Sequence, residues 1–147
     1  MAMIDLHPPS SGLPIASALF WCLAEISQVV QKYKHQANIL RPLAVLLAAV
    51  GVTTAFLTGY TASSNLSELS TTVEDAVAYH HAWGKLLLVD SLCLVALYFL
   101  QRVATHGKGI LTVLYYICGA IFVLGAFGVG HLGGELVFEM GVNVKSP

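Results

Sequence analysis

Four long apolar stretches, separated by short polar segments, constrain this chain more than any other feature of its sequence. A helix needs about 20 mainly apolar residues to cross the hydrocarbon core of a bilayer, because each residue adds roughly 1.5 Å of rise. Suitable stretches lie at about 13–33, 40–60, 82–102 and 110–131. With 56% hydrophobic and 10% charged residues, the chain has too much apolar surface for a water-soluble fold of this size. We therefore predict an all-α fold, a four-helix transmembrane bundle forming one membrane domain over residues 1–147.

The basic residues of the short loops predict how the bundle is oriented. Lys32, Lys34 and Arg41 lie at or next to the connection of the first two spans, and Arg102 and Lys108 at or next to the connection of the last two. Because Lys and Arg are retained on the cytoplasmic side, both loops are expected there. Both termini then lie on the non-cytoplasmic side of the membrane.

Two local patterns refine this prediction. Thr71 and Glu74 match a T-x-x-E capping box, so a helix is expected to begin near residue 72 and to run through the histidines into the third span. In the second span, small residues recur at every fourth position, which lets a neighbouring helix approach closely. These residues are Gly51, Ala55 and Gly59.

The predicted topology sorts the six histidines into two groups. His7, His80, His81 and His131 fall at the outer ends of spans, whereas His35 and His106 fall in the cytoplasmic loops. His81 is 21 residues from Arg102, and His131 is 21 residues from Ile110. Both are therefore about 31 Å from the cytoplasmic edge, at the same level. Imidazoles that converge from separate helices are typical of a cofactor site in a helical bundle.

Glycines near two of these histidines favour a flat ligand. Gly84 follows His81 by three residues, and Gly128 precedes His131 by three. In antiparallel helices each glycine then lies one turn deeper than its histidine, on the same face. The gap suits the edge of a macrocycle, with aromatic walls expected from Trp83 and Phe127.

These patterns lead to the hypothesis that the chain binds a haem b near its outer surface. His81 and His131 are the preferred axial ligands, and His7 or His80 can replace either one. The chain contains no C-x-x-C-H motif, so covalent attachment of a c-type haem is not supported.

Further residues extend this hypothesis. Lys85 is expected to reach a haem propionate, and Glu135 to orient His131 through its free ring nitrogen. A second haem on the cytoplasmic side would use His35 and His106. The expected function is electron transfer between a membrane donor, such as quinone, and an extracytoplasmic partner.

Two other classes of function stay open. The chain can be a small accessory subunit of a larger membrane complex, with its histidines as interfacial anchors in contact with lipid. Alternatively, the same histidines can bind copper or zinc, because imidazole does not by itself select iron. A net charge of −1 does not suggest a nucleic-acid surface, and no metalloprotease H-E-x-x-H motif or phosphate-binding glycine loop suggests hydrolysis.

Two acidic residues, Glu25 and Asp90, lie inside the apolar spans. An unpaired charge at the centre of a membrane helix costs about 3 kcal/mol or more. Either residue can relay protons, or form hydrogen bonds inside the bundle in its neutral form. The structural role is favoured, because no basic residue is expected at that depth.

The segment from His7 to Ile15 also carries a family resemblance. It reads H-P-P-S-S-G-L-P-I and resembles an uncharacterised family of small four-span bacterial membrane proteins, a domain of unknown function. The family pattern is His-Pro-x-x-Val-His-Phe-Pro-Ile, matched here by His7, Pro8, Pro14 and Ile15. Gly12 stands in place of the second histidine. The resemblance implies four helices in a bacterial cell (inner) membrane, and a histidine at the start of the third span, which His80 or His81 supplies.

Overall fold

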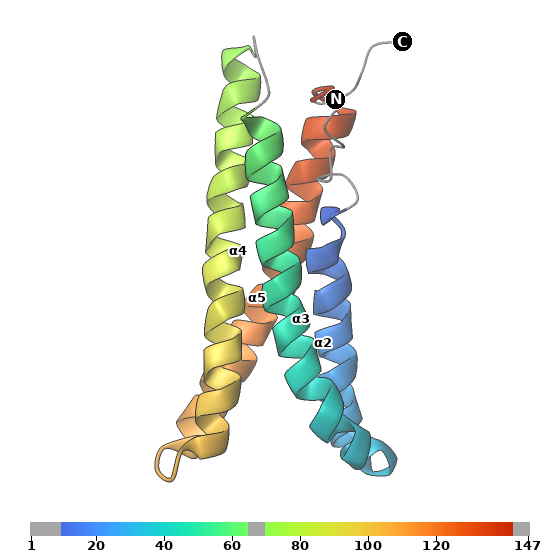
Figure 1. Ribbon diagram of the computed structural model, residues 1–147, viewed down its shortest axis with the longest axis vertical. Coiled ribbons are helices and arrows are strands. Elements are labelled where there is room, and N and C mark those ends of the chain that lie inside the picture. Colours follow the sequence, from blue (N-terminus) through green and yellow to red (C-terminus); the bar gives the residue numbers. More distant parts are fainter. Residues whose placement is uncertain (1–9, 65–69, 143–147) are drawn as a thin grey trace.

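The computed structural model describes residues 10–64 and 70–142 as a set of long helices (Figure 1). The α-helices are α2 (Leu13–Val29), α3 (Lys34–Ser63), α4 (Thr71–Val103) and α5 (Lys108–Phe138). A short 3-10 helix, η1 (Gln31–Tyr33), joins α2 to α3. The described ranges contain no β-strand, so the predicted all-α fold is confirmed.

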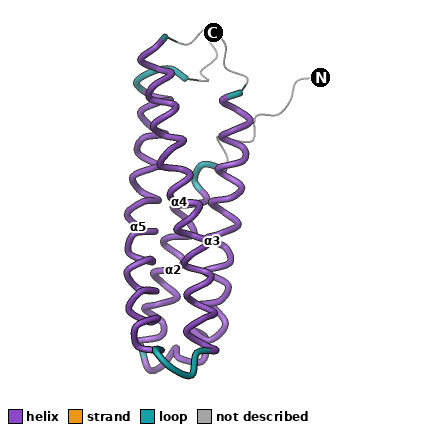
Figure 2. Tube along the Cα trace, turned by 90° about the vertical axis from the view of Figure 1, so that its left-hand side faces the viewer, coloured by secondary structure: helices purple, strands orange, loops and turns teal. Residues whose placement is uncertain are grey.

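Each helix runs antiparallel to the next, and α5 packs back against α2 to complete the bundle (Figures 1 and 2). The connections at 30–33 and 104–107 lie at the same end of the bundle, which we call the basic end because of its lysines and arginines. At the opposite end, α2 begins and α5 ends. We call it the cavity end, because a cavity lies between the helices there. Which side of the membrane each end faces stays a prediction.

The dimensions and surface of these helices suit a bilayer. The helices α3, α4 and α5 have 30, 33 and 31 residues and are apolar enough to cross a membrane. With 17 residues, α2 is about 26 Å long and lies at the short end of the range for a spanning helix. Large apolar side chains are exposed along all of them, as expected for contact with lipid. The chain is a four-helix transmembrane bundle.

The helix ends follow from local residues. Pro14 stands in the first turn of α2, where its missing amide hydrogen costs little. Gly107, with φ of 68°, occupies the left-handed region just before α5. The α4 helix runs unbroken through the histidines, as predicted, but its N-cap is Ser70. The expected capping box is wrong, because the amide of Glu74 bonds to the Ser70 carbonyl and no side chain caps this helix in the described structure.

The core lies towards the basic end and combines alanines with large aromatic rings. Buried alanines of α2 and α3 let these helices approach closely, while Tyr98, Tyr115 and Phe122 fill the space beside them. The indole of Trp21 lies against Gly119, where an added Cβ would overlap the ring. This half of the bundle is therefore packed with little freedom for larger side chains.

Candidate functional site

A cavity of about 500 Å³ lies between the helices at the cavity end. Small and apolar residues of α3, α4 and α5 form most of its wall, and the start of α2 forms the rest. In the described part of the chain, its wall contains no Asp, Glu, Lys or Arg, but it contains two histidines, His80 and His81. Cofactor sites have volumes of about 300–1,000 Å³ and mainly apolar walls with few polar groups, so this cavity has the size and composition of such a site.

The cavity lies beyond the start of α2, the shortest of the four α-helices that the structure describes (Figure 1). An added Cβ at Gly51 would lie 3.4 Å from Leu13, so α2 begins level with the middle of α3. From there α3 continues to Ser63, about 18 Å further. Across the bundle, Ile15 contacts the position of Gly130, and α5 also continues beyond it. Among the described residues, α3, α4 and α5 therefore enclose most of this space, beyond the start of α2.

The two histidines of the cavity lie side by side on α4 but turn towards different neighbours. An added Cβ at Gly133 of α5 would lie 3.2 Å from Cε1 of His80. The ring of His81 lies 6.3 Å from that of Tyr60 on α3, measured between centroids. The two imidazole centroids are 6.2 Å apart, with their planes tilted by 47°. The α4 wall thus presents one imidazole towards α5 and the other towards α3.

Gly84 also lines the cavity, one turn from His81 on α4, as the spacing predicted. An added Cβ there would lie 3.5 Å from the ring of Phe56, which supplies an aromatic part of the wall. The expected aromatic wall from Trp83 is wrong, because Trp83 is 42% exposed and does not line the cavity. The small residues that recur along α3 have two different roles. Gly51 packs against α2, whereas Ala55 and Gly59 line the cavity.

The structure does not bring His131 to His81. The side chain of His131 is 76% exposed and does not line the cavity. Its Nε2 lies 3.2 Å from Oε1 of Glu135, so the expected contact between these two side chains is present. Gly128 and Phe127 are exposed as well and do not line the cavity.

The direction around the helix explains this correction. Counting residues gives the depth of His131 in the membrane, but successive residues of a helix point about 100° apart. Gly130, Gly133 and Gly134 are among the residues of α5 that line the cavity, whereas His131 is not. His131 follows Gly130 directly, so it points towards the outside of the bundle.

The remaining sequence-predicted site residues lie elsewhere. Lys85 is exposed and does not line the cavity, and His35 and His106 are exposed at the basic end. His7 lies outside the described residues. Within the described ranges, no three side chains of His, Cys, Asp or Glu are arranged to hold a metal ion.

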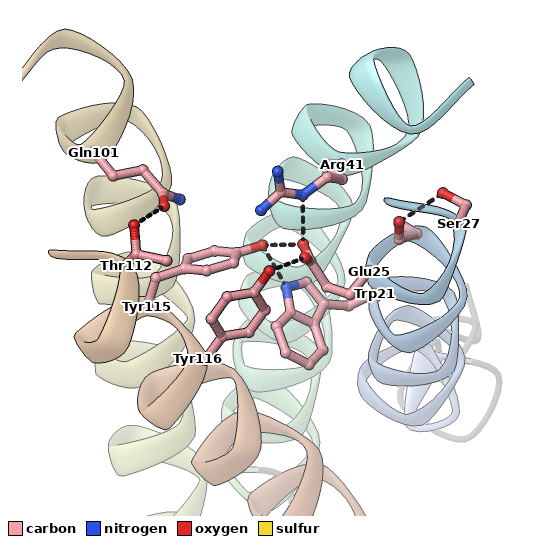
Figure 3. Close-up of polar contacts among 9 residues, drawn as sticks. Trp21, Glu25, Ser27, Arg41, Gln101, Thr112, Tyr115 and Tyr116 are labelled. Carbon is pink, nitrogen blue, oxygen red and sulfur yellow. Dashed lines mark hydrogen bonds and ion pairs between the residues drawn. The ribbon is translucent and has the colours of Figure 1, made fainter. Parts of the chain in front are cut away.

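A second polar cluster lies towards the basic end and centres on Glu25 (Figure 3). Arg41 donates from Nε to Oε1 of Glu25 at 2.9 Å, and both side chains are at most 13% exposed. The hydroxyls of Tyr115 and Tyr116 donate to the two carboxylate oxygens at 2.5 Å and 3.1 Å. Trp21 donates from its indole nitrogen to the Tyr115 hydroxyl at 2.8 Å. The cluster connects α2, α3 and α5.

This cluster corrects the expectation that no basic residue reaches the depth of Glu25. The signal was present in the sequence, because Glu25 lies five residues before the turn at 30–33 and Arg41 eight residues after it, a difference in depth of about 4.5 Å that a long arginine side chain can span. Counting outward from a helical hairpin places such residues at similar levels. The sequence did not indicate the aromatic partners of Glu25, because Tyr115 and Tyr116 lie in α5, 90 and 91 residues away.

Asp90 has a different environment in the middle of α4. The thiol of Cys118 donates to Oδ1 of Asp90 at 3.1 Å. The second carboxyl oxygen, Oδ2, is buried without a hydrogen-bond partner among the described residues. Asp90 lies one turn from Leu87, which lines the cavity. Of the two acids in the spans, Glu25 is thus ion-paired, whereas the described residues offer the Asp90 carboxyl only the weak thiol donor of Cys118.

Comparison with known proteins agrees with this architecture. Residues 3–146 match the model of a protein family described as "Predicted membrane protein (DUF2231)". Searches of curated proteins and of solved structures found no match. Because the match extends over almost the whole chain, the protein belongs to the DUF2231 family of predicted membrane proteins.

Proposed function

We propose that the cavity binds a haem b, with one imidazole of α4 as the iron ligand. The protein would then transfer electrons between a donor in the membrane and a partner outside it. The observation that carries this proposal is the pair of histidines in the wall of a cavity of about 500 Å³. Neutral imidazole is a common haem ligand, and an apolar wall suits a macrocycle. The glycines of α4 and α5 keep the space beside the imidazoles open.

The proposed site uses one protein ligand from α4 rather than the predicted pair. His80 and His81 are adjacent on one helix, so they cannot approach the iron from opposite faces of one macrocycle. His81 is the preferred ligand, because Gly84, one turn away, leaves room beside its ring. The ring of His80 lies against Gly133 of α5, so it would contribute to the wall of the site and not to binding the iron.

The position of the cavity supports an amphipathic ligand. Tyr60, Tyr79 and Trp83 are all exposed at this level of the bundle. Such aromatic side chains mark the interface between lipid and water. A haem there can keep its macrocycle in the bundle and its propionates near water. Lys85, the expected partner of a propionate, is exposed one turn deeper than His81 and does not line the cavity, so it is not part of the proposed site.

Electron transfer is proposed to run between a membrane donor such as quinone and a protein partner on the outer side of a bacterial cell membrane. The cavity end then faces the periplasm, as the loop charges predict. Asp90 is the better candidate for a proton relay, because one of its oxygens has no partner in the described structure. Glu25 is engaged by Arg41 and two tyrosines and is assigned a structural role.

The test is an absorption spectrum of the purified protein, oxidised and reduced, after expression with adequate haem supply. We expect a Soret band that His81→Ala removes and His131→Ala leaves unchanged. The His131 variant is a matched control, because it removes an exposed imidazole from the same level of the bundle. A colourless wild-type protein, or a Soret band that depends on His131 and not on α4, would overturn the proposal. Quinone retained by a colourless protein would assign the cavity to that ligand instead.

A further inference from the structure

Unused hydrogen-bond donors gather around one tyrosine at the basic end, away from the cavity. The guanidinium carbons of Arg41 and Arg102 lie 5.7 Å and 4.9 Å from the ring centroid of Tyr98. Tyr98 is 1% exposed, and its hydroxyl has no hydrogen-bond partner in the described structure. Two guanidinium groups therefore lie beside one buried ring, whose hydroxyl finds no partner within residues 10–64 and 70–142.

The charge around this ring is only partly neutralised. Glu25 accepts a hydrogen bond from Nε of Arg41, and no other described group accepts one from that guanidinium. Arg102 forms no ion pair or hydrogen bond with any described residue, although it contacts Tyr98. One positive charge and several N–H donors thus have no acceptor within residues 10–64 and 70–142.

Gln101 adds another donor group on the same side of α4. Residues three and four positions apart share a helix face, so Gln101 and Arg102 lie on the face of Tyr98. Gln101 is 7% exposed, and its amide nitrogen has no partner among the described residues. Its amide oxygen accepts a hydrogen bond from Thr112 at 3.2 Å. In Figure 3 the amide of Gln101 and the guanidinium of Arg41 turn towards each other across the bundle.

We propose that this group of residues binds the phosphate of an anionic lipid headgroup at the basic end of the bundle. Buried polar groups are almost always hydrogen-bonded, so the Tyr98 hydroxyl and the Gln101 amide nitrogen, which have no partner among the described residues, indicate a missing acceptor beside the unneutralised guanidinium of Arg102. A phosphate oxygen accepts strongly from guanidinium groups and supplies the negative charge. A lipid is the favoured source, because Arg102 lies between Leu100 and Val103, which are 50% and 75% exposed on the lipid-facing surface.

The experiment measures binding of phosphatidylglycerol and of phosphatidylcholine to the full-length protein by native mass spectrometry. We expect one tightly retained phosphatidylglycerol, weakened about tenfold by Arg102→Gln and several-fold by Tyr98→Phe, because each loses a hydrogen bond to a charged group. Lys108→Gln is the matched control: it removes one charge from the same end, outside the group around Tyr98, and it should change binding less than twofold.

A second arm separates a lipid from a free anion. If inorganic phosphate at millimolar concentration stabilises wild type but not Arg102→Gln, the site is confirmed with a soluble source. If phosphatidylglycerol stabilises wild type but not Arg102→Gln, and inorganic phosphate stabilises neither, the lipid is confirmed as the ligand. Equal retention of phosphatidylglycerol by wild type, Arg102→Gln and Tyr98→Phe would overturn the proposal, as would equal losses in Arg102→Gln and Lys108→Gln. Tyr98→Phe keeps the ring in the core, so it remains informative if Arg102→Gln fails to fold.

Discussion

The two ends of this bundle differ in how polar side chains are accommodated within the membrane. Towards the basic end, charged and aromatic side chains from three helices form one connected network around Glu25. At the cavity end, glycines and small side chains leave about 500 Å³ open beside two imidazoles. One half therefore fixes how the helices pack, whereas the other half keeps an open cavity between them.

The largest expected effect comes from breaking the ion pair of the packed half. Arg41→Met leaves the Glu25 carboxylate buried without its cation, and we expect a loss of about 3–5 kcal/mol in the free energy of unfolding. Denaturant titration of the detergent-solubilised protein, followed by circular dichroism, measures it. The double variant Glu25→Gln, Arg41→Met should recover part of the loss, since no uncompensated charge remains. A loss below about 1 kcal/mol in Arg41→Met would show that the network does not hold this half together.

The fold was predictable because hydropathy alone gives the number and position of the spans. The candidate site was predictable only in part. His81 and Gly84 share a face of α4, and their spacing of three residues is enough to show this. The predicted pairing of His81 with His131 is wrong, because counting residues gives the depth of His131 in the membrane but not the direction in which its side chain points from α5. The run of glycines at 128–134 held the missing signal, since Gly130 and Gly134 are four apart and mark the inward face.

The next effect tests whether Tyr115 joins the network or only fills space. Tyr115→Phe keeps the ring but removes the hydroxyl that accepts from Trp21 and donates to Glu25. We expect a loss of about 1.5–3 kcal/mol, the range for a hydrogen bond to a charged group. Tyr116→Phe is the matched control, because Tyr116 is 43% exposed and its bond to Glu25 is longer at 3.1 Å. Its loss should be the smaller one in the same titration, and equal losses would contradict the central place of Tyr115.

A glycine substitution tests how tightly the packed half is filled. Gly119→Ala places a Cβ inside the space of the Trp21 indole, so the ring or the α5 backbone must shift. Overpacking of this kind costs about 1–3 kcal/mol. Gly128→Ala is the control on the same helix, because an added Cβ there meets nothing within 4 Å. The control should be neutral or slightly stabilising, by up to about 1 kcal/mol, because alanine favours a helix more than glycine does. Thermal unfolding of both variants measures the difference, and a neutral Gly119→Ala would mean that this half is looser than its contacts suggest.

The smallest effect on stability, and the sharpest test of the difference between the two ends, comes from filling the cavity. Gly84→Leu adds a side chain beside Phe56, where a Cβ makes only ordinary contact at 3.5 Å, and the rest of the leucine extends into open space. We expect a change within about 1 kcal/mol in the free energy of unfolding, since apolar burial offsets the adjustment of neighbours. Haem content per protein, measured by absorbance, should nevertheless fall strongly, because the macrocycle and the leucine need the same volume. A stable variant that keeps its haem would place the ligand outside the cavity. A variant that unfolds would show instead that the cavity end is as tightly constrained as the core around Trp21, so that the two ends do not differ in the way proposed.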